Sequence, residues 1–503
     1  MSMQHCIFKS PLTVSYYLEQ GDKLIGKEIE ITGRLTRFTT QSKIIFGALS
    51  DGSCPEELQF IYEIKADVEQ PTGITELIER VKTGSSVTLF GRIVKAPPKA
   101  KQVIELYIKD VKVISIVREP DTYPYGLSAM KKRSKEDWTE YLKSIRSDIH
   151  RRFRHKIMSS IMRIRGASKS ALFEFFTSLG FVSSDSPILT KSDCEGAGEM
   201  FTVTGFKLDD IAHKDDGTID YSKDFFGSEA HLSVSGQLEA ESLAQVLGKV
   251  FTFGPTFRAE DSHTPRHLAE FWMLEPELVF PQYDIEHRFQ SLMDLEESMV
   301  KCVIGYLFEK CLDDLKFLDS TCSPMLIEKL SKILDESFAR VTYTECIDIL
   351  SKKVADGYQF EDSKIFWGMD LASEHEKYLC EKEFKKPTFV THYPQDLKSF
   401  YMKADLGCAL DRQTVQAVDL LIPGIGELCG GSMREDDPDK LVEVMKKKGV
   451  PTKDLQWYID LRYDGGLPTG GFGLGFERLV TFVTGAPSVR DTIAFPRYPK
   501  HLE

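Results

Sequence analysis

The chain lacks long apolar segments. No run among its 503 residues approaches the roughly 18 apolar residues of a membrane-spanning helix, so we expect no membrane span. The first residues, MSMQHCIFKSPLTVSYYLEQGDKL, contain neither the apolar core of a signal peptide nor the arginine-rich amphipathic pattern of a transit peptide. We therefore expect a cytoplasmic protein without a targeting segment.

Cysteine spacings typical of metal or redox chemistry are also missing. The ten cysteines are scattered, with no Cys-x-x-Cys pair and no Cys/His spacing of a zinc site. Reduced thiols in a cytosolic protein are the expected state.

The sequence has no excess of basic residues. Its 77 acidic residues outnumber 64 basic ones, which gives a net charge of −13. This charge argues against indiscriminate binding of nucleic acid, but a local basic surface remains compatible with it. The length and an apolar content of 42% fit two to four globular domains.

The first 118 residues show the alternation of a β-barrel. Strands are predicted at 28–38, 43–51, 56–62, 85–97 and 103–117, with a short helix at 74–84 that ends at Gly84. Three strands, a helix and two strands are the order of a five-stranded OB barrel, which binds oligonucleotides on one face. That face would carry Arg34, Arg37, Phe46 and Gln59. Surface arginines and a core Phe are equally typical of any small barrel.

A joint and a basic helix follow the barrel. Residues 119–143 include two prolines and a charge run, which are typical of a linker, and residues 144–180 have a helical pattern. An RNA backbone contact and an ordinary solvated helix face both explain the basic cluster at the helix start: Arg146, Arg151, Arg152, Arg154 and Lys156.

The rest of the chain mixes strands and helices. Segments 231–237, 249–260 and 269–280 resemble strands, and 287–315 has helical periodicity. If 249–260 and 269–280 pair antiparallel, Arg258 shares a sheet face with Glu260, and Phe271 shares one with Met273.

The polar loop between these two segments adds Arg266 and His267. A ring that stacks on a base, beside cations that meet phosphates, would suit a nucleotide. An Arg–Glu pair and a buried Phe are also common in sheets without any ligand.

A glycine-rich run near the end of the chain, LPTGGFGLGFERLVTFVTG (467–485), supports a nucleotide site. Its glycines allow a ligand or backbone to approach closely, and Arg478 would lie near the start of the helix that follows. The pattern is not the Rossmann G-x-G-x-x-G. A glycine-rich strand packed under a helix is the structural alternative.

Two acidic residues of VDLLIPGIGELCGGSMREDD (418–437) suggest a metal. Asp419 and Glu427 are candidate Mg²⁺ ligands because hard cations that bridge phosphates prefer carboxylate oxygen. Two acids eight residues apart prove nothing alone.

Taken together, these segments resemble a class II aminoacyl-tRNA synthetase. SLGFVSSDSPILT resembles the first motif of that class, FRAE with RHLAEF the second, and GFGLGFERL the third. The barrel marks the aspartyl, asparaginyl and lysyl subgroup. The stretches most similar to bacterial-type asparaginyl-tRNA synthetases are DCEGAGEMF (193–201), VSGQLEAE (234–241), FGPTFRAE, HLAEFWMLEPE and GELCGGSMRE (426–435).

The resemblance implies an α+β architecture. An anticodon-binding OB β-barrel would span 1–118, a linker 119–143, and a catalytic domain with an antiparallel β-sheet flanked by helices 144–503. The dimer-interface motif would lie at about 166–190, the ATP loop at 257–277 and the glycine-rich strand and helix at 467–485. The implied activity is ATP-dependent ligation of L-asparagine to tRNA(Asn) by a homodimer through an asparaginyl-adenylate, with release of AMP and pyrophosphate.

The resemblance also assigns residue roles. Arg258, Glu260 and Arg478 would be catalytic, and Phe271 would stack on adenine. Arg266 and His267 would meet the outer phosphates, while Asp419 and Glu427 would position Mg²⁺. Glu195 and Gln237 would bind the ammonium of the amino acid. Anticodon contacts would come from Arg34, Phe46 and Gln59.

Selection of asparagine would depend on two residues. A carboxamide offers a donor and an acceptor, so Glu241 would accept from its NH₂ and Arg434 would donate to its oxygen. Aspartate would face the charge of Glu241, which would give specificity.

Three alternative functions remain. The first is an aspartyl-tRNA synthetase, including a nondiscriminating one. The second is an ATP-dependent asparagine synthetase on the same fold, which should lack the barrel. The third is a non-catalytic, synthetase-like RNA-binding protein, which would usually have lost an ATP-binding arginine.

Overall fold

The structure, a computed structural model, describes residues 12–65, 68–118, 135–191, 200–262, 264–280, 285–409 and 412–502. The chain forms two compact units. The first comprises the residues up to Ser160 together with Lys316–Cys322, and the second comprises Ile161–Leu315 together with the residues from Ser323 onward. The limits proposed for the linker, 119 and 143, remain predictions.

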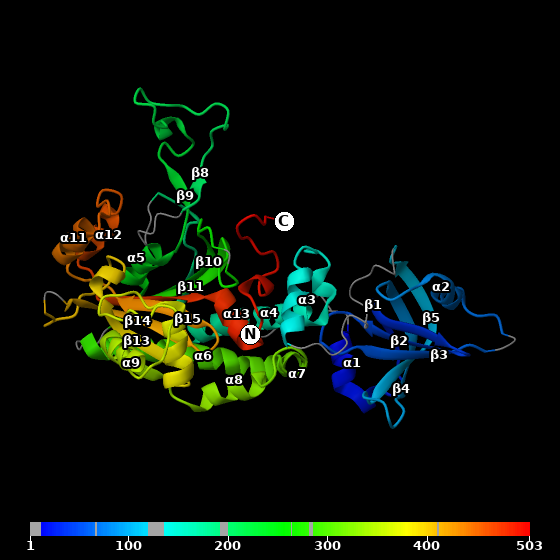
Figure 1. Ribbon diagram of the computed structural model, residues 1–503. Helices are drawn as coiled ribbons and strands as arrows, with labels where there is room; N and C mark the ends of the chain where they lie inside the picture. Colours follow the sequence, from blue (N-terminus) through cyan, green and yellow to red (C-terminus); the bar gives the residue numbers. More distant parts are fainter. Residues whose placement is uncertain are drawn as a thin grey trace. The chain divides into compact units, whose positions relative to one another are not determined.

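The first unit is built around a closed barrel of five strands in the order β1-β2-β3-β5-β4 (Figure 1). This is the predicted OB-type barrel. Its elements are α1 (Val14–Gln20), a 3₁₀ turn (Gly21–Leu24), β1 (Glu28–Gln41), β2 (Ile44–Ser50), β3 (Leu58–Glu63), α2 (Thr72–Arg80), β4 (Ser86–Lys95), β5 (Ile104–Ser115), α3 (Lys135–Ser144) and a 3₁₀ turn (Arg152–Arg154).

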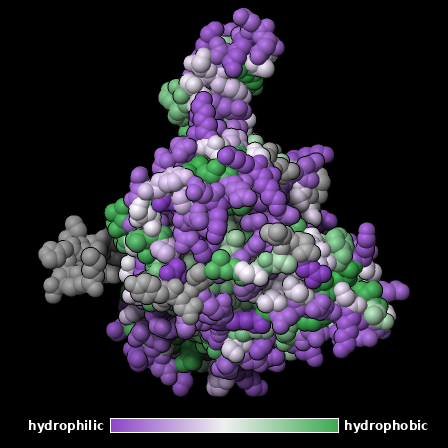
Figure 2. Space-filling view, turned by 90° about the vertical axis from the view of Figure 1, so that its left-hand side faces the viewer, coloured by the Kyte–Doolittle hydropathy of each residue, from purple (hydrophilic) through white to green (hydrophobic). Residues whose placement is uncertain are grey.

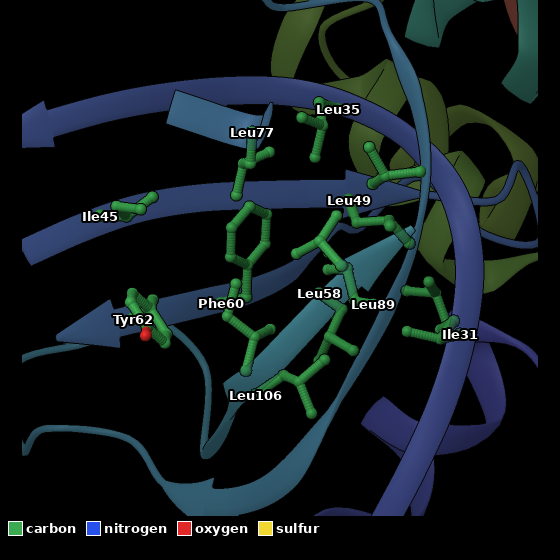
Figure 3. Close-up of a cluster of buried hydrophobic side chains, with 14 of the residues drawn as sticks. Ile31, Leu35, Ile45, Leu49, Leu58, Phe60, Tyr62, Leu77, Leu89 and Leu106 are labelled. Carbon is green, nitrogen blue, oxygen red and sulfur yellow. The ribbon is translucent and has the colours of Figure 1, made fainter. Parts of the chain in front are cut away.

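The barrel is filled by side chains from every strand and from α2. Alternate residues of a strand point to opposite faces, so every second residue enters the interior. Burying a Leu, Ile or Phe side chain stabilises the fold by about 1.5–3 kcal/mol, which makes this cluster the main support of the unit. The side chains labelled in Figure 3 are Ile31, Leu35, Ile45, Leu49, Leu58, Phe60, Tyr62, Leu77, Leu89 and Leu106.

The helix in the barrel ends earlier than its sequence suggests. α2 stops at Arg80 because Val81 adopts an extended backbone with ψ of 140°. Gly84 has φ of +94°, a left-handed conformation that favours glycine. It therefore forms the turn into β4 rather than capping the helix.

Not every residue of the basic cluster at 146–156 is exposed, so an RNA backbone contact stays a prediction for its exposed members alone. Arg152 is fully buried. Arg151 pairs with Asp148 at 2.9 Å, and Lys156 pairs with Glu57 at 2.7 Å. The predicted long helix starts only at Lys156, after a 3₁₀ turn at Arg152–Arg154.

The second unit contains an eight-stranded sheet in the order β12-β13-β14-β15-β16-β11-β10-β6. The inner strands are antiparallel, as predicted, and the outermost pair at each edge is parallel. Its strands are β6 (Val182–Ser184), β10 (Lys249–Phe257), β11 (Glu270–Val279), β12 (Ala339–Thr342), β13 (Thr388–Pro394), β14 (Thr414–Ile422), β15 (Gly426–Met433) and β16 (Thr469–Gly475).

Helices cover both faces of this sheet, with α6 and α8 on one side and α5 on the other (Figure 1). None of the described helices combines the length and hydropathy needed to cross a membrane. The helices are α4 (Lys156–Ser178), α5 (Gln237–Leu247), α6 (Ile285–Lys310), α7 (Leu312–Thr321), α8 (Leu326–Asp335), α9 (Tyr343–Ala355), α10 (Ser373–Lys377), a π turn (Tyr378–Glu383), α11 (Pro438–Lys447), α12 (Gln456–Tyr463) and α13 (Phe476–Thr484). Short 3₁₀ turns occupy Tyr221–Lys223, Gln395–Leu397 and Val489–Asp491.

A projection rises from a small three-stranded sheet formed by β7 (Leu189–Thr190), β9 (Ala230–Leu232) and β8 (Thr202–Val203). Residues 204–229 form this projection, which extends away from the large sheet (Figure 1). Its residues are mainly hydrophilic (Figure 2). Asp224 ties its base together by accepting hydrogen bonds from Thr204 Oγ1 and the Gly205 N–H. The strand predicted at 231–237 is shorter in the structure, where β9 ends at Leu232 and α5 begins at Gln237.

Candidate active site

A pocket of about 700 Å³, counting the part open to solvent, lies on the large sheet. It is formed by the hairpin of β10 and β11, by β15, and by the junction of β16 with α13. All seven residues that the resemblance assigns to the nucleotide line it: Arg258, Glu260, Arg266, His267, Phe271, Glu427 and Arg478.

The hairpin has the predicted antiparallel pairing, with Thr256 opposite Phe271 and Gly254 opposite Met273. Arg258 follows the end of β10 instead of lying within it, as does Glu260. The Arg258 guanidinium lies 5.5 Å from the centroid of the Phe271 ring. A cation and an aromatic face are thus held side by side at one wall of the pocket.

The loop between the two strands carries Arg266 and His267. The Arg266 Nη1 group donates to Ser373 Oγ at 2.7 Å, which ties the loop to α10. His267 Nδ1 lies 2.9 Å from Ser262 Oγ. Burial lowers the pKa of His267, so its ring is neutral at pH 7 and acts as a hydrogen-bonding group rather than a cation.

Arg478 lies in the first turn of α13, directly after the glycine-rich strand, as predicted. Its Nη1 group donates to the backbone oxygen of Glu427 at 2.8 Å and lies 3.4 Å from the Glu427 carboxylate. Glycines 473 and 475 of β16 also line the pocket. Because these glycines have no side chains, β16 leaves room for a ligand at the floor of the pocket.

The two predicted metal ligands converge. A Cβ atom on Gly430 would lie 2.9 Å from Glu427 Oε1 and 3.5 Å from Asp419 Oδ1, so both carboxylates face the space above this glycine. Asp419 pairs with Lys398 Nζ at 2.5 Å. Two oxygen donors above a glycine fit a hard cation. No group of three or more acidic, His or Cys ligands occurs among the residues that the structure describes.

The charges of this pair are set by their surroundings. Burial raises the pKa of Glu427, but Arg478, Lys398 and Arg258 together outweigh it and hold that pKa below its usual value. Burial raises the pKa of Asp419, and Lys398 opposes that shift. Glu427 is therefore ionised and ready to meet a cation.

Glu241 and Arg434 belong to one buried network beside the same strand. Thr469, the first residue of β16, donates its hydroxyl to Glu241 Oε1 at 2.9 Å, and its backbone oxygen accepts from the Arg434 N–H at 2.9 Å. The Glu241 side chain and the Arg434 backbone are thus linked through a single residue. Glu241 is fully buried, and Arg434 is 3% exposed.

Glu277, which we did not predict as a site residue, pairs with Arg434 inside this network. Arg434 donates to Glu277 through both Nε and Nη2 and to Ser432 Oγ through Nη1. A Cβ atom on Gly471 would lie 2.3 Å from Glu277 Oε1, so only glycine leaves room for this carboxylate. The alternation of acids in WMLEPE was a usable signal, since two acids on one face of a buried strand need partners.

The turn before α5 is held by Glu275. This carboxylate accepts hydrogen bonds from Ser235 Oγ and from the Gly236 N–H. Gln237 follows the turn, and its buried Nε2 group has no partner within the described stretches. An unpartnered buried donor fits a ligand group that accepts a hydrogen bond, whereas the predicted contact with an ammonium would use Gln237 Oε1 as the acceptor. Glu195, the other residue predicted to bind the ammonium, lies outside the described residues.

The SEHEKYL segment also contributes to the site. His375 is fully buried, and its Nε2 lies 3.0 Å from the Asp362 backbone oxygen, while Glu374 accepts from the Asp362 N–H. These contacts anchor α10. Ser373 and Glu376 are three residues apart and therefore share one face of α10. This face lies toward Arg266.

Glu376 itself lies close to the nucleotide pocket. A Cβ atom on Gly426 would lie 2.9 Å from Glu376 Oε2 and 2.5 Å from Arg266 Nη2. Burial, with repulsion from Glu427 and Asp419, raises the pKa of Glu376 to about 7. His375 thus has a structural role, whereas Glu376 belongs to the pocket surroundings.

The residues proposed to read the anticodon lie on the outer side of the barrel. Phe46 is 43% exposed. Arg37 on β1 and Gln59 on β3 both lie opposite Ala48 on β2. Arg34 on β1 lies opposite Ser50 on β2. The four side chains therefore belong to three adjacent strands on one face.

Comparison with known proteins agrees with this geometry. A family model described as tRNA synthetases class II (D, K and N) matches residues 143–499. An asparagine--tRNA ligase of Cytophaga hutchinsonii is 42% identical over 492 residues, covering 98% of this chain and 99% of that protein. One from Mycoplasma mycoides is 43% identical over 492 residues, covering 98% and 100%.

A solved structure has the same fold along nearly the whole chain. It is the asparaginyl-tRNA synthetase of Pyrococcus horikoshii complexed with asparaginyl-adenylate. The TM-score is 0.79 with 29% sequence identity, and the match covers 98% of this chain and 100% of the other.

Proposed function

The chain belongs to the class II tRNA synthetases of the D, K and N group, and from this premise we propose that it ligates L-asparagine to tRNA(Asn) with ATP. One observation carries the proposal beyond the family. The pocket lined by Arg258, Arg266 and Arg478 and the network of Glu241 and Arg434 share one strand, β16. A triphosphate and an amino acid can therefore meet above the same glycines.

The first step joins asparagine to the α-phosphorus of ATP. A carboxylate oxygen of asparagine forms the new bond to phosphorus, the bond from that phosphorus to the bridging oxygen breaks, and pyrophosphate leaves. Such chemistry depends mainly on position and charge neutralisation. We assign Arg258 to the α-phosphate, Glu260 to the nucleotide and metal environment, and Arg266, His267 and Arg478 to the outer phosphates. Phe271 stacks on adenine.

Mg²⁺ fits the carboxylate pair over Gly430. Asp419 and Glu427 supply the oxygen donors that this ion prefers, and Glu427 is held ionised by its cationic neighbours. The bound ion would neutralise phosphate charge.

The second step transfers the amino acid. A ribose hydroxyl at the 3′ end of tRNA attacks the acyl carbon, the bond to the phosphate oxygen breaks, and AMP leaves with the electron pair. No side-chain nucleophile is needed. Glu195 and Gln237 hold the substrate ammonium during both steps.

The carboxamide of asparagine is bound by Glu241 and Arg434. Thr469, Tyr458 and Arg462 engage three acceptor positions of the Glu241 carboxylate, which leaves one position on Oε2 for the substrate NH₂. Arg434 has N–H groups on Nη1 and Nη2 beyond those used for Ser432 and Glu277, and these can donate to the substrate oxygen.

The barrel supplies the tRNA contact. Exposed aromatic rings stack on unpaired bases, so Phe46 is assigned to an anticodon base, with Arg34 and Gln59 beside it. We propose a cytoplasmic location, where tRNA, ATP and asparagine are all available.

A homodimer is supported by exposed apolar side chains within 166–190 and on α5. The edge strand β6 has an open side, and several large apolar side chains near it are exposed by 41–83%, more than a lone monomer surface needs. They are Leu179, Val182, Ile188, Leu189, Leu243, Val246 and Leu247.

Amino-acid-dependent exchange of pyrophosphate into ATP tests this function. We expect exchange with asparagine and on the order of 10⁴-fold less with aspartate. Equal exchange with aspartate would identify a nondiscriminating or aspartyl enzyme. Absence of exchange with every amino acid would identify a non-catalytic relative.

A further inference from the structure

Arg462 forms a buried ion pair with Glu241. It lies in α12 with a side chain that is 4% exposed. Its Nη2 group donates to Glu241 Oε1 at 2.5 Å and to the Tyr458 hydroxyl at 2.9 Å. Its Nε donates to the Glu435 backbone oxygen at 3.0 Å, and Nη1 to the Tyr458 backbone oxygen at 3.2 Å.

Tyr458 also holds the Glu241 carboxylate in position. Its hydroxyl donates to Glu241 Oε2 at 2.6 Å, while the Arg462 guanidinium lies 4.1 Å from the centroid of its ring. Both oxygens of Glu241 are therefore fixed in position before any ligand arrives. Three of roughly four acceptor positions on a carboxylate are used, so the direction of the remaining one is defined.

The network is also balanced in charge. Arg462 pairs with Glu241, and Arg434 pairs with Glu277. The charges cancel within each of these two ion pairs, so a neutral carboxamide meets no excess charge from them, whereas aspartate would add a negative charge for which neither pair has a spare counter-ion. A buried unpaired charge is strongly unfavourable. The expected exclusion of aspartate therefore depends on all four charged groups and not on repulsion by Glu241 alone.

We propose that Arg462 is a specificity-determining positioning residue, which holds Glu241 as an anion with a single acceptor position for the asparagine side chain and completes a neutral pocket. The proposal rests on the function proposed above. Arg462 acts through Glu241 and does not touch the substrate.

Pyrophosphate exchange with Arg462→Lys, Arg462→Gln and Tyr458→Phe tests the positioning. We expect the KM for asparagine to rise roughly 10- to 100-fold in Arg462→Gln, the usual effect of losing a hydrogen bond to a charged group, with the KM for ATP unchanged. Arg462→Lys should recover part of the loss, and Tyr458→Phe should show a smaller increase. Arg163→Gln is the matched control, because Arg163 also pairs with a buried carboxylate, Asp314, away from the pocket.

A double substitution tests the charge balance. Glu241→Gln alone leaves an excess positive charge, so we expect exchange with aspartate to increase at least about tenfold. Adding Arg462→Gln restores neutrality, so that gain should disappear. A merely structural role for Arg462 predicts no such reversal, and tryptophan fluorescence on unfolding confirms that each variant is folded.

The outcomes separate the two levels of inference. Wild-type enzyme that gives no exchange with asparagine would contradict the proposed function. Active wild type, with a folded Arg462→Gln variant that retains the normal KM for asparagine, would overturn the role of Arg462. Equal aspartate activity in Glu241→Gln and in the double variant would overturn the charge balance.

Discussion

Arg266 Nη1 donates a hydrogen bond of 2.7 Å to Ser373 Oγ, a residue 107 positions further along the chain. The contact joins the loop between β10 and β11 to α10. It fixes the position of an arginine that we assign to the outer phosphates. Positioning a binding group in advance lowers the cost of ordering it when the ligand arrives.

Ser373→Ala should therefore weaken ATP binding. Loss of one hydrogen bond to a charged group costs about 1.5–3 kcal/mol, so we expect the KM for ATP to rise about tenfold or more while the KM for asparagine stays constant. Pyrophosphate exchange at varied ATP measures this. Ser298→Ala is the control, since its hydroxyl donates within α6 to the Asp294 backbone oxygen. An unchanged KM for ATP would show that Arg266 needs no support from α10.

Glu376 should make the ligand-free enzyme less stable as the pH rises. Its pKa is raised from 4.5 to about 7, so between these values the folded state holds a proton that the unfolded state releases. Stability must then fall as pH increases through this range, by up to about 3 kcal/mol. Glu376→Gln removes the ionisable group.

Urea unfolding of both proteins at pH 5 and pH 8, in EDTA without ATP, measures this effect. We expect Glu376→Gln to be more stable than wild type at pH 8 and similar to it at pH 5. Equal differences at the two pH values would refute the assignment.

Gly471→Ala should damage the amino-acid site. A Cβ atom there would lie 2.3 Å from both Glu277 Oε1 and the Pro276 backbone oxygen, so the carboxylate that pairs with Arg434 must move. Overpacking of this kind typically costs about 1–3 kcal/mol. We expect a large loss of asparagine-dependent exchange. Gly254→Ala is the control, because an added Cβ meets no atom within 4 Å on β10; equal losses in the two variants would argue against a special role for Gly471.

Phe46→Ala should separate tRNA binding from activation of the amino acid. The ring is exposed on the barrel, so its removal should leave pyrophosphate exchange intact and lower the kcat/KM for tRNA. Stacking on a base contributes about 1–3 kcal/mol, which corresponds to a loss of roughly 5- to 150-fold. Ile114→Ala, on β5, provides a control with a similarly exposed apolar side chain. Normal charging kinetics in Phe46→Ala would remove this residue from the tRNA interface.

The sequence predicted best those features that depend on neighbouring residues. Strand alternation indicated the barrel, and glycines followed by FERLV placed Arg478 at a helix start, which the structure confirms. The pairing of β10 with β11 follows from their short separation in the chain.

Features that depend on distant pairing were not predictable in this way. Glu277 meets Arg434 across 157 residues, and Arg462 meets Glu241 across 221. Nothing in local periodicity indicates which buried acid and base will pair. Arg152 shows the converse, because a basic run looks solvated in sequence while one of its members is buried.

Charging of a tRNA(Asn) transcript by the wild-type enzyme, with asparagine or aspartate supplied separately, tests the central claim most directly. Balanced charges around Glu241 and Arg434 predict that asparagine is attached and that aspartate is not, even at high enzyme concentration. Attachment of aspartate at a comparable rate would contradict the account.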